Sequence, residues 1–459
     1  MSSIQTRGTR SHSLARHARD TVRLAAPLAI TQLSQMAMSI TDTAMLGSLG
    51  AQALAAGGLA ASLGFSITML LQGVLSSLSV TVSHARGSSE DSLVPRIYWT
   101  GLVLAGLLSI VAFGILSVVE PVLIALGEPA SLAQAVAHYC LVLRWSAPAT
   151  LVGIGVMRAF LPAIGAAERL LWVSVAGVFI NAFLNYGLIN GAFGLPRLGF
   201  LGSALATTLT LWVSALALLV LLHTRLSLRH WVRMVPPHWP VLGELFAIGW
   251  PVAITYGVEV MFFLCASMMA GWMGAGTLAA HQIALNIASV AFMVPLALGQ
   301  AANVRVAYWL GAGKPEAARH AGFVALALGA GFMAIAACTM VLIPRQIIGL
   351  YVRLDDPANA MTVALAIELL RVAALFQIVD GIQVVGSGCL RAFQDTRIPM
   401  CLAAFGYWGI GLPVGYFLGV RQGEGALGLW WGFAAGLASV ALLMILRFGR
   451  ISALRLLPD

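Results

Sequence analysis

The segment Pro27-Leu-Ala-Ile-Thr31 recurs as Pro251-Val-Ala-Ile-Thr255 in the second half of the chain. We call the difference between positions 27 and 251 the repeat offset. Later in each half, Arg158-Ala-Phe160 corresponds to Arg391-Ala-Phe393 at a slightly larger offset. Self-similarity at a nearly constant spacing indicates duplicated structural units. The sequence therefore predicts two homologous halves that share one arrangement of elements.

Each half is made of long apolar runs. The chain of 459 residues is 60% hydrophobic and 9% charged, whereas soluble domains contain about 25% charged residues. Runs of about 20 apolar residues, which suffice to cross a hydrocarbon core of about 30 Å, recur along the chain. Examples are residues 101–119, 205–222 and 321–343. We therefore expect an all-α integral membrane protein, with about twelve transmembrane helices in two homologous six-helix bundles around a central cleft.

Apolar length and breaker residues predict the positions of the helices. The predicted spans are 24–47, 52–80, 97–119, 131–157, 168–190, 198–222, 243–272, 278–307, 320–343, 359–388, 398–420 and 425–447. This pattern divides the chain into five parts. They are a basic tail (1–23), an N-terminal lobe (24–222), a linker (223–242), a C-terminal lobe (243–447) and a second tail (448–459).

Basic residues predict the orientation in the membrane. An even number of helices places both termini on one side, and arginines crowd the N-terminal tail, at Arg7, Arg10, Arg16, Arg19 and Arg23. Most other basic residues fall in segments assigned to the same side, Arg158 and Arg391 among them. Because basic loops stay in the cytoplasm, we expect a multi-pass protein of a cell inner membrane with cytoplasmic termini. The basic clusters are short and separate, which argues against nucleic-acid binding.

Three acidic residues, Asp42, Glu259 and Asp380, lie inside predicted helices. A carboxylate at membrane depth costs a few kcal/mol, so it normally faces a cavity and handles ions or protons. We therefore predict that these three residues face a cavity and bind an ion or a proton. The alternative is a neutral, hydrogen-bonded carboxyl group with a structural role.

Asp42 lies at the same predicted depth as Asn181 and Asn185, whose i, i+4 spacing puts both amides on one helix face. Thr207 or Thr208 on the next helix can add a hydroxyl group. Carboxylate and amide oxygens suit a hard cation, so we predict a Na⁺ site at Asp42, Asn181 and Asn185, or a proton relay. The alternative is that the asparagines only form hydrogen bonds between helices.

Glu259 and Asp380 lie near the middle of the seventh and tenth predicted helices. If both face the interior of the second bundle, each carboxylate affects the protonation of the other, as a proton-coupled carrier requires. The same pair would attract an organic cation. We add Gln35 and Gln282 to the polar groups that support these sites.

Missing motifs narrow the function. The segment Gly311-Ala-Gly313-Lys314 lacks the spacing of a phosphate-binding loop, so we expect no direct use of ATP. Neither an HExxH nor a GxSxG motif supports an intramembrane hydrolase. We therefore expect a non-enzymatic carrier with no cofactor other than H⁺ or Na⁺. Five prolines mark candidate helix kinks, Pro27, Pro148, Pro251, Pro295 and Pro413.

Four segments carry a resemblance to a known family. They are the first predicted helix from Pro27 to Gly47, Asn181-Ala-Phe-Leu-Asn185-Tyr-Gly187, Ala279-Ala-His281-Gln-Ile-Ala-Leu-Asn286, and Phe376-Gln-Ile-Val-Asp380-Gly-Ile-Gln383. The chain resembles the multidrug and toxic compound extrusion (MATE) family over nearly its whole length, and its NorM-like bacterial branch in particular.

The resemblance implies a twelve-helix antiporter that expels amphipathic, often cationic compounds in exchange for H⁺ or Na⁺ by alternating access. It assigns coupling roles to Asp42, Glu259 and Asp380, with support from the fifth-helix asparagines. Phe376 stands where some sodium-coupled members carry a tyrosine, which favours H⁺. We expect a monomer whose partners are small molecules and the lipid bilayer.

A lipid-linked oligosaccharide flippase with a related two-lobed fold is the alternative function. Such a protein needs cationic residues in its cleft to bind a diphosphate. The charges predicted at the centre of this chain are acidic, which favours the exporter.

Overall fold

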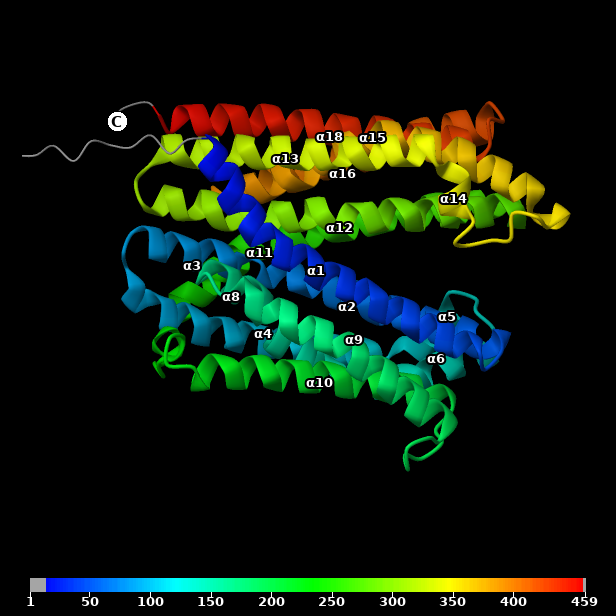
Figure 1. Ribbon diagram of the computed structural model, residues 1–459, viewed down its shortest axis with the longest axis horizontal. Coiled ribbons are helices and arrows are strands. Elements are labelled where there is room, and N and C mark those ends of the chain that lie inside the picture. The colour runs from blue at the N-terminus through cyan, green and yellow to red at the C-terminus, as the bar shows by residue number, and fades with distance from the viewer. Residues whose placement is uncertain (1–13, 457–459) are drawn as a thin grey trace, which may run out of the picture.

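The computed structural model describes residues 14–456, which form helices joined by short loops, with no β-strand in this range. Eleven helical segments are long and apolar enough to cross a membrane. The first helix, α1 (Leu14–Gly47), is 34 residues long but more polar, and it lies alongside the others (Figure 1). With α1, the fold has the twelve long helical segments expected for two bundles of six.

The N-terminal lobe contains ten helices or helical pieces. After α1 come α2 (Ala51–Leu75), α3 (Ser77–Gly87), α4 (Val94–Ser117), α5 (Val119–Ala125), α6 (Ala130–Leu143), α7 (Ser146–Pro148), α8 (Val156–Ala163), α9 (Ala167–Asn190) and α10 (Phe200–Thr224). Helices α2 and α3 form one span. A buried apolar core joins α2, α3, α4, α8 and α10.

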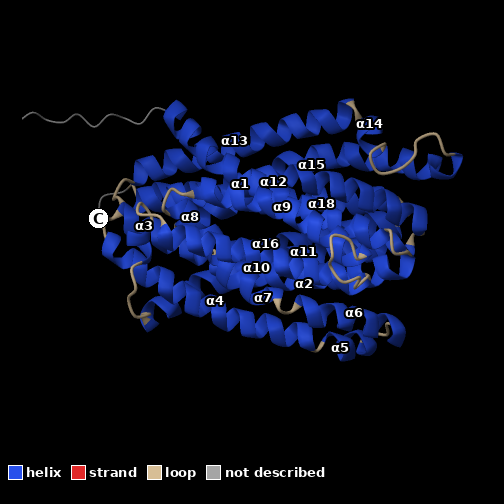
Figure 2. Cartoon of the chain, turned by 60° about the horizontal axis from the view of Figure 1, so that its bottom comes forward, coloured by secondary structure: helices blue, strands red, loops and turns tan. Residues whose placement is uncertain are grey.

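The C-terminal lobe contains eight. They are α11 (Trp239–Trp272), α12 (Ala275–Gly311), α13 (Pro315–Leu342), α14 (Pro344–Ile348), α15 (Ala360–Ala392), α16 (Arg397–Ala404), α17 (Leu412–Tyr416) and α18 (Ala426–Leu454). Its core joins α12, α13, α15 and α18. The two lobes lie one above the other in Figure 1, and Figure 2 shows that loops occur mainly at the two ends of the helices.

Two of the proline positions coincide with π-helical turns. The short α7 ends at Pro148, and a π-helix follows over Ala149–Gly155. Pro413 lies in α17, which is flanked by π-helices at Phe405–Gly411 and Phe417–Arg421. Proline removes a backbone donor, and the wider turn relaxes the hydrogen-bond ladder around it. π-helical turns therefore interrupt the α-helical pattern of the fourth and eleventh spans at two of the five prolines that mark candidate kinks in the sequence.

All spans alternate between two ends of the molecule. One end carries α3, α8 and the last turns of α18, at the left of Figure 1, and we call it the terminal end. The other carries α5 and α14, at the right, and we call it the far end. The ribbons of the two lobes converge toward the terminal end and separate toward the far end (Figure 1).

The lobes meet at the terminal end around a pair of residues related by the repeat. The amide of Asn303 on α12 donates a hydrogen bond of 2.7 Å to the hydroxyl of Ser79 on α3, and both side chains are buried. Position 79 shifts to position 303 by the same offset that carries position 27 onto position 251. Residues that are images of each other can touch only on the symmetry axis, so the pseudo-twofold axis passes through this bond.

The backbones of α3 and α12 also touch reciprocally near this axis. A Cβ atom at Gly87 would lie 2.1 Å from the carbonyl oxygen of Tyr308, and one at Gly311 would lie 2.2 Å from that of His84. Gly87 and Gly311 are again related by the repeat offset. Two glycines therefore allow the helices to cross in direct contact, as small residues do in membrane interfaces.

Replacing Gly87 by alanine is expected to lower the melting temperature of the purified protein, because overpacking typically costs about 1–3 kcal/mol. Thermal unfolding in detergent measures this. The matched control is Gly331→Ala on α13, where a Cβ atom meets nothing within 4 Å. Equal melting temperatures for the two variants would show that the α3–α12 crossing does not stabilise the folded protein.

Candidate functional site

Asp42 is the centre of a polar cluster in the N-terminal lobe. Its carboxylate accepts hydrogen bonds from Nδ2 of Asn185 at 2.7 Å, Nδ2 of Asn181 at 3.1 Å and Oγ1 of Thr207 at 2.9 Å. Helices α1, α9 and α10 supply these side chains, and both asparagines are fully buried. Thr208 instead donates to the carbonyl of Ala204. The structure thus brings together Asp42, Asn181, Asn185 and Thr207.

The hydrogen bonds of this cluster match an ionised carboxylate, which can only accept. The Oδ1 atoms of Asn181 and Asn185 are buried and have no hydrogen-bond partner among residues 14–456. Because an asparagine amide can turn over, its oxygen can replace its nitrogen beside Asp42. The same residues can therefore surround a cation with oxygen atoms. They fit either Na⁺ or a proton at Asp42.

A second acidic cluster lies in the C-terminal lobe. Glu259 on α11 is half-buried, whereas Asp380 on α15 is 8% exposed, and the two are close enough to interact electrostatically. Tyr407, in the π-helix Phe405–Gly411, lies within electrostatic range of both carboxyl groups. Its hydroxyl is buried without a hydrogen-bond partner in the described part of the chain. Sequence reasoning missed Tyr407, because it lies in an aromatic run without polar spacing.

Gln35 lies with Arg158 rather than with Asp42. Nη1 of Arg158 donates to Oε1 of Gln35 at 2.8 Å and to Oε1 of Gln72 at 3.4 Å, and Nη2 donates to Oε1 of Gln32. Arg158 was expected on the basic side outside the membrane. It lies instead within α8 and points toward α1 and α2, where three neutral amides hold its charge.

Arg391 occupies the corresponding place in the other lobe. It lies in the last turn of α15, is 7% exposed, and its Nη2 is 3.5 Å from the hydroxyl of Tyr256. The repeat places Tyr256 on Gln32 and Glu259 on Gln35. Glu259 is therefore the acidic counterpart of a glutamine that binds Arg158. The expectation that the interior charges are only acidic is wrong, because Arg391 is buried and Arg158, which is half-buried, binds amides of α1 and α2.

The family model named MatE matches the chain twice, at residues 27–187 and 251–417. The two matches begin at positions 27 and 251, which confirms the repeat. This chain belongs to the MatE family. The NorM-like assignment is confirmed by a relative, "Multidrug resistance protein NorM" of Burkholderia vietnamiensis, which is 64% identical over 436 residues and covers 95% of this chain and 94% of the relative.

Solved structures of MatE-type transporters share the fold. The "Crystal structure of eukaryotic MATE transporter AtDTX14" superimposes with a TM-score of 0.85 at 21% identity, covering 97% of this chain and 100% of that chain. The "Outward-facing conformation of a multidrug resistance MATE family transporter of the MOP superfamily" has a TM-score of 0.86 at 19% identity, with coverages of 98% and 99%. The two-lobed, all-α membrane fold is thus confirmed.

One predicted supporting residue of this MatE protein lies apart from both clusters. Gln282 on α12 is exposed, and no hydrogen bond within residues 14–456 joins it to Glu259 or Asp380. Its neighbour His281 is fully buried, with Nε2 3.0 Å from the hydroxyl of Ser267. This contact and its burial indicate that His281 has a structural role in the helix packing of the C-terminal lobe.

Proposed function

We propose that the protein is a secondary active exporter of amphipathic, often cationic compounds, driven by an inward ion gradient. The main support is the acidic pair Glu259 and Asp380 inside the C-terminal lobe, with Tyr407 beside it. An organic cation and a coupling ion can both neutralise these carboxylates, so each displaces the other. The name of the relative from Burkholderia vietnamiensis supports multidrug export.

The interface between the lobes supports alternating access. At the terminal end the lobes touch through small residues such as Gly87 and Gly311, a hydrogen bond joins Ser79 to Asn303, and Arg305 of α12 forms a single ion pair with the half-exposed Asp20 of α1. Contacts of this kind can separate without leaving several buried charges unpaired. Rocking of the two repeats would then expose the acidic sites to alternate sides of the membrane.

We propose H⁺ as the coupling ion at Glu259 and Asp380. Phe376, one turn before Asp380 on α15, is buried against the ring of Trp430 at 5.5 Å and supplies no oxygen ligand. Tyr407 can exchange hydrogen bonds with a carboxyl group in either protonation state. Na⁺ at the Asp42 cluster remains the competing assignment, for which the unpartnered amide oxygens of Asn181 and Asn185 provide support.

Purified protein in proteoliposomes tests this function directly. A fluorescent organic cation should move against an imposed pH gradient, and an imposed Na⁺ gradient alone should drive little movement. Movement under the Na⁺ gradient alone would assign coupling to the Asp42 cluster. No movement under either gradient would contradict ion-coupled export.

The half-buried Arg158 and the buried Arg391 favour a second candidate, a lipid-linked oligosaccharide flippase, because a diphosphate needs cations. Three glutamines already occupy the donors of Arg158, but Nε of Arg391 is buried without a hydrogen-bond partner among the described residues. The same proteoliposomes decide between the functions. Translocation of a lipid-linked diphosphate sugar without an ion gradient would replace the exporter by the flippase.

The terminal end is expected to face the cytoplasm, because basic residues concentrate there. In a variant without the five native cysteines, a cysteine at Ser88 should resist an impermeant maleimide in intact cells. A cysteine at Asp355, at the far end, should react. Both positions are exposed. The reverse pattern would invert the topology.

A further inference from the structure

The two sides of the pseudo-twofold axis differ at the terminal end. On one side, Arg305 of α12 holds the start of α1. Its Nη1 donates to the carbonyl oxygen of His17 at 2.5 Å and to Oγ1 of Thr21 at 3.0 Å, and its Nη2 is 3.5 Å from Oδ2 of Asp20. The indole of Trp309 packs edge-on against the His17 ring, with centroids 6.1 Å apart. We call this group the arginine clamp.

The repeat predicts a second clamp on the other side of the axis. The repeat offset places Asp20 on Glu244, so the carboxylate is retained. It also places Arg305 on Thr81 and Trp309 on Ala85. The second side of the axis therefore has a carboxylate, but it lacks the arginine and tryptophan side chains that occupy the first side.

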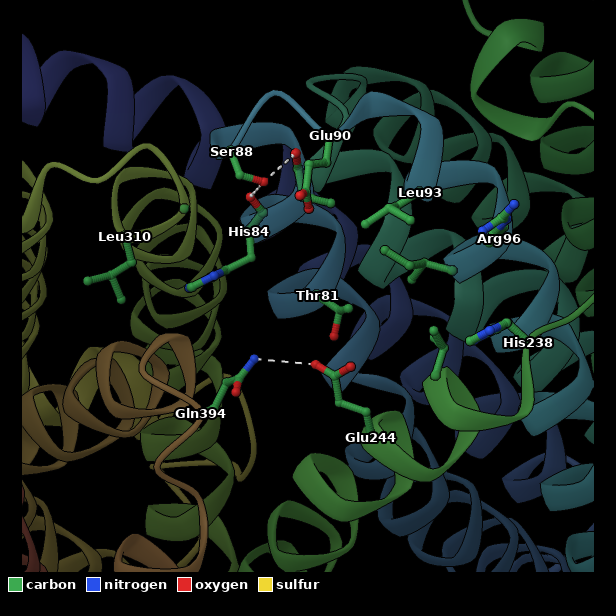
Figure 3. Close-up of a pocket in the computed structure, with 14 residues that line it drawn as sticks. Thr81, His84, Ser88, Glu90, Leu93, Arg96, His238, Glu244, Leu310 and Gln394 are labelled. Carbon is green, nitrogen blue, oxygen red and sulfur yellow. Dashed lines mark hydrogen bonds between the residues drawn. The ribbon is translucent and has the colours of Figure 1, made fainter.

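A cavity of about 500 Å³ lies where those side chains are missing, and Thr81, Ala85 and Glu244 all line it. Figure 3 shows Glu244 facing Gln394 across the cavity, and Nε2 of Gln394 is 3.5 Å from Oε1 of Glu244. No cationic side chain in residues 14–456 forms an ion pair with Glu244. The acid of the second clamp is present without its guanidinium.

The remaining walls suit an amphipathic molecule. Apolar side chains line the cavity beside the carboxylates of Glu244 and Glu90, namely Leu93, Ile97, Val241 and Leu310. Three basic residues, His84, Arg96 and His238, also line it, so a bound cation has to lie toward Glu244 (Figure 3). A cavity of this volume lies within the range of small-molecule sites.

We propose that this cavity binds an amphipathic cation whose guanidinium or ammonium group lies at Glu244, in the position that Arg305 takes in the clamp. The walls come from α3 and α4 of one lobe and from α11 and α12 of the other. A bound molecule therefore stabilises the contact between the lobes at the terminal end, because a ligand favours the state to which it binds better. The bound molecule slows transport. Its site is distinct from the interior carboxylates of the proposed export function.

Binding of phenethylguanidine to the purified full-length protein in detergent tests the site. This probe has a guanidinium group on a short apolar body, and isothermal titration calorimetry measures its affinity without any gradient. Glu244→Gln should weaken binding at least tenfold, since it removes a charged hydrogen-bond acceptor. Glu316→Gln, an exposed acid at the start of α13, is the matched control and should bind as wild type.

Thr81→Arg provides a second variant, because it restores the arginine of the clamp. It should abolish probe binding and raise the melting temperature, whereas Thr81→Ser should retain both wild-type values.

The double variant Asp42→Asn, Asp380→Asn should still bind the probe, which separates this site from the interior carboxylates. The proposal is overturned if wild type does not bind at about 10 mM probe, a concentration that would nearly saturate a millimolar site. Wild-type affinity in Glu244→Gln overturns it as well.

Discussion

Replacing Asp380 by asparagine is expected to reduce gradient-driven efflux to the background of cells that lack the protein. The amide keeps the size of the side chain, but it does not ionise and so offers neither a titratable proton nor a negative charge for a cation. Asp380 is 8% exposed and lies within electrostatic range of Glu259, so its charge is little screened by solvent. Efflux of a fluorescent cation from energised cells measures the effect at matched expression.

Glu368→Gln is the control on the same helix. Glu368 is exposed and pairs with Arg371 in the next turn, on the outside of α15. Exposed ion pairs contribute about 0–1 kcal/mol, so this variant should transport normally. Near-normal efflux in Asp380→Asn, with an unchanged melting temperature, would give Asp380 a structural role only.

Replacing Asp42 by asparagine should also stop coupled efflux, through the other lobe. Three donors converge on this carboxylate, from Asn181, Asn185 and Thr207. A neutral amide at position 42 offers one acceptor oxygen and brings a competing NH₂ group. A hydrogen bond to a charged group contributes about 1.5–3 kcal/mol, so the loss affects the folded cluster as well as ion exchange.

Thermal unfolding separates the two effects of Asp42→Asn. Glu128→Gln, an exposed acid at the far end, is the control for the loss of one acidic charge. Asp42→Asn that folds like the control but does not transport would support a coupling role. If efflux fell only in proportion to the folded fraction, Asp42 would be structural and coupling would belong to Glu259 and Asp380.

The sequence predicted the parts of the fold that depend on local pattern. Apolar run length predicted the number and order of the spans, and the repeat offset predicted the two lobes. The spacing of Asn181 and Asn185 placed their amides on one face, where the structure joins them to Asp42. The i, i+4 geometry of a helix is sufficient for such a prediction.

Features that depend on distant partners were not predictable in this way. Arg158 and Arg391 were assigned to the basic side because they lie near predicted helix ends. Gln32, Gln35 and Gln72, which belong to the first two helices of the chain, bring the Arg158 guanidinium into the interior. A hydropathy profile cannot predict which distant side chains will bind an arginine. The start of α1 was placed at residue 24 rather than Leu14 for a similar reason, since its first turns depend on Arg305.

The hydrogen bond between Ser79 and Asn303 bears on how such a chain arises by gene duplication. In a symmetric dimer of half-length ancestors, this position would face its own copy, and the same side chain would have to act as both donor and acceptor. Fusion of the two copies into one reading frame removes that restriction, because each copy then mutates independently. In this chain, one copy has become an amide donor and the other a small hydroxyl acceptor. The arginine clamp and the cavity show the same difference between the copies, since position 305 holds an arginine and position 81 holds a threonine.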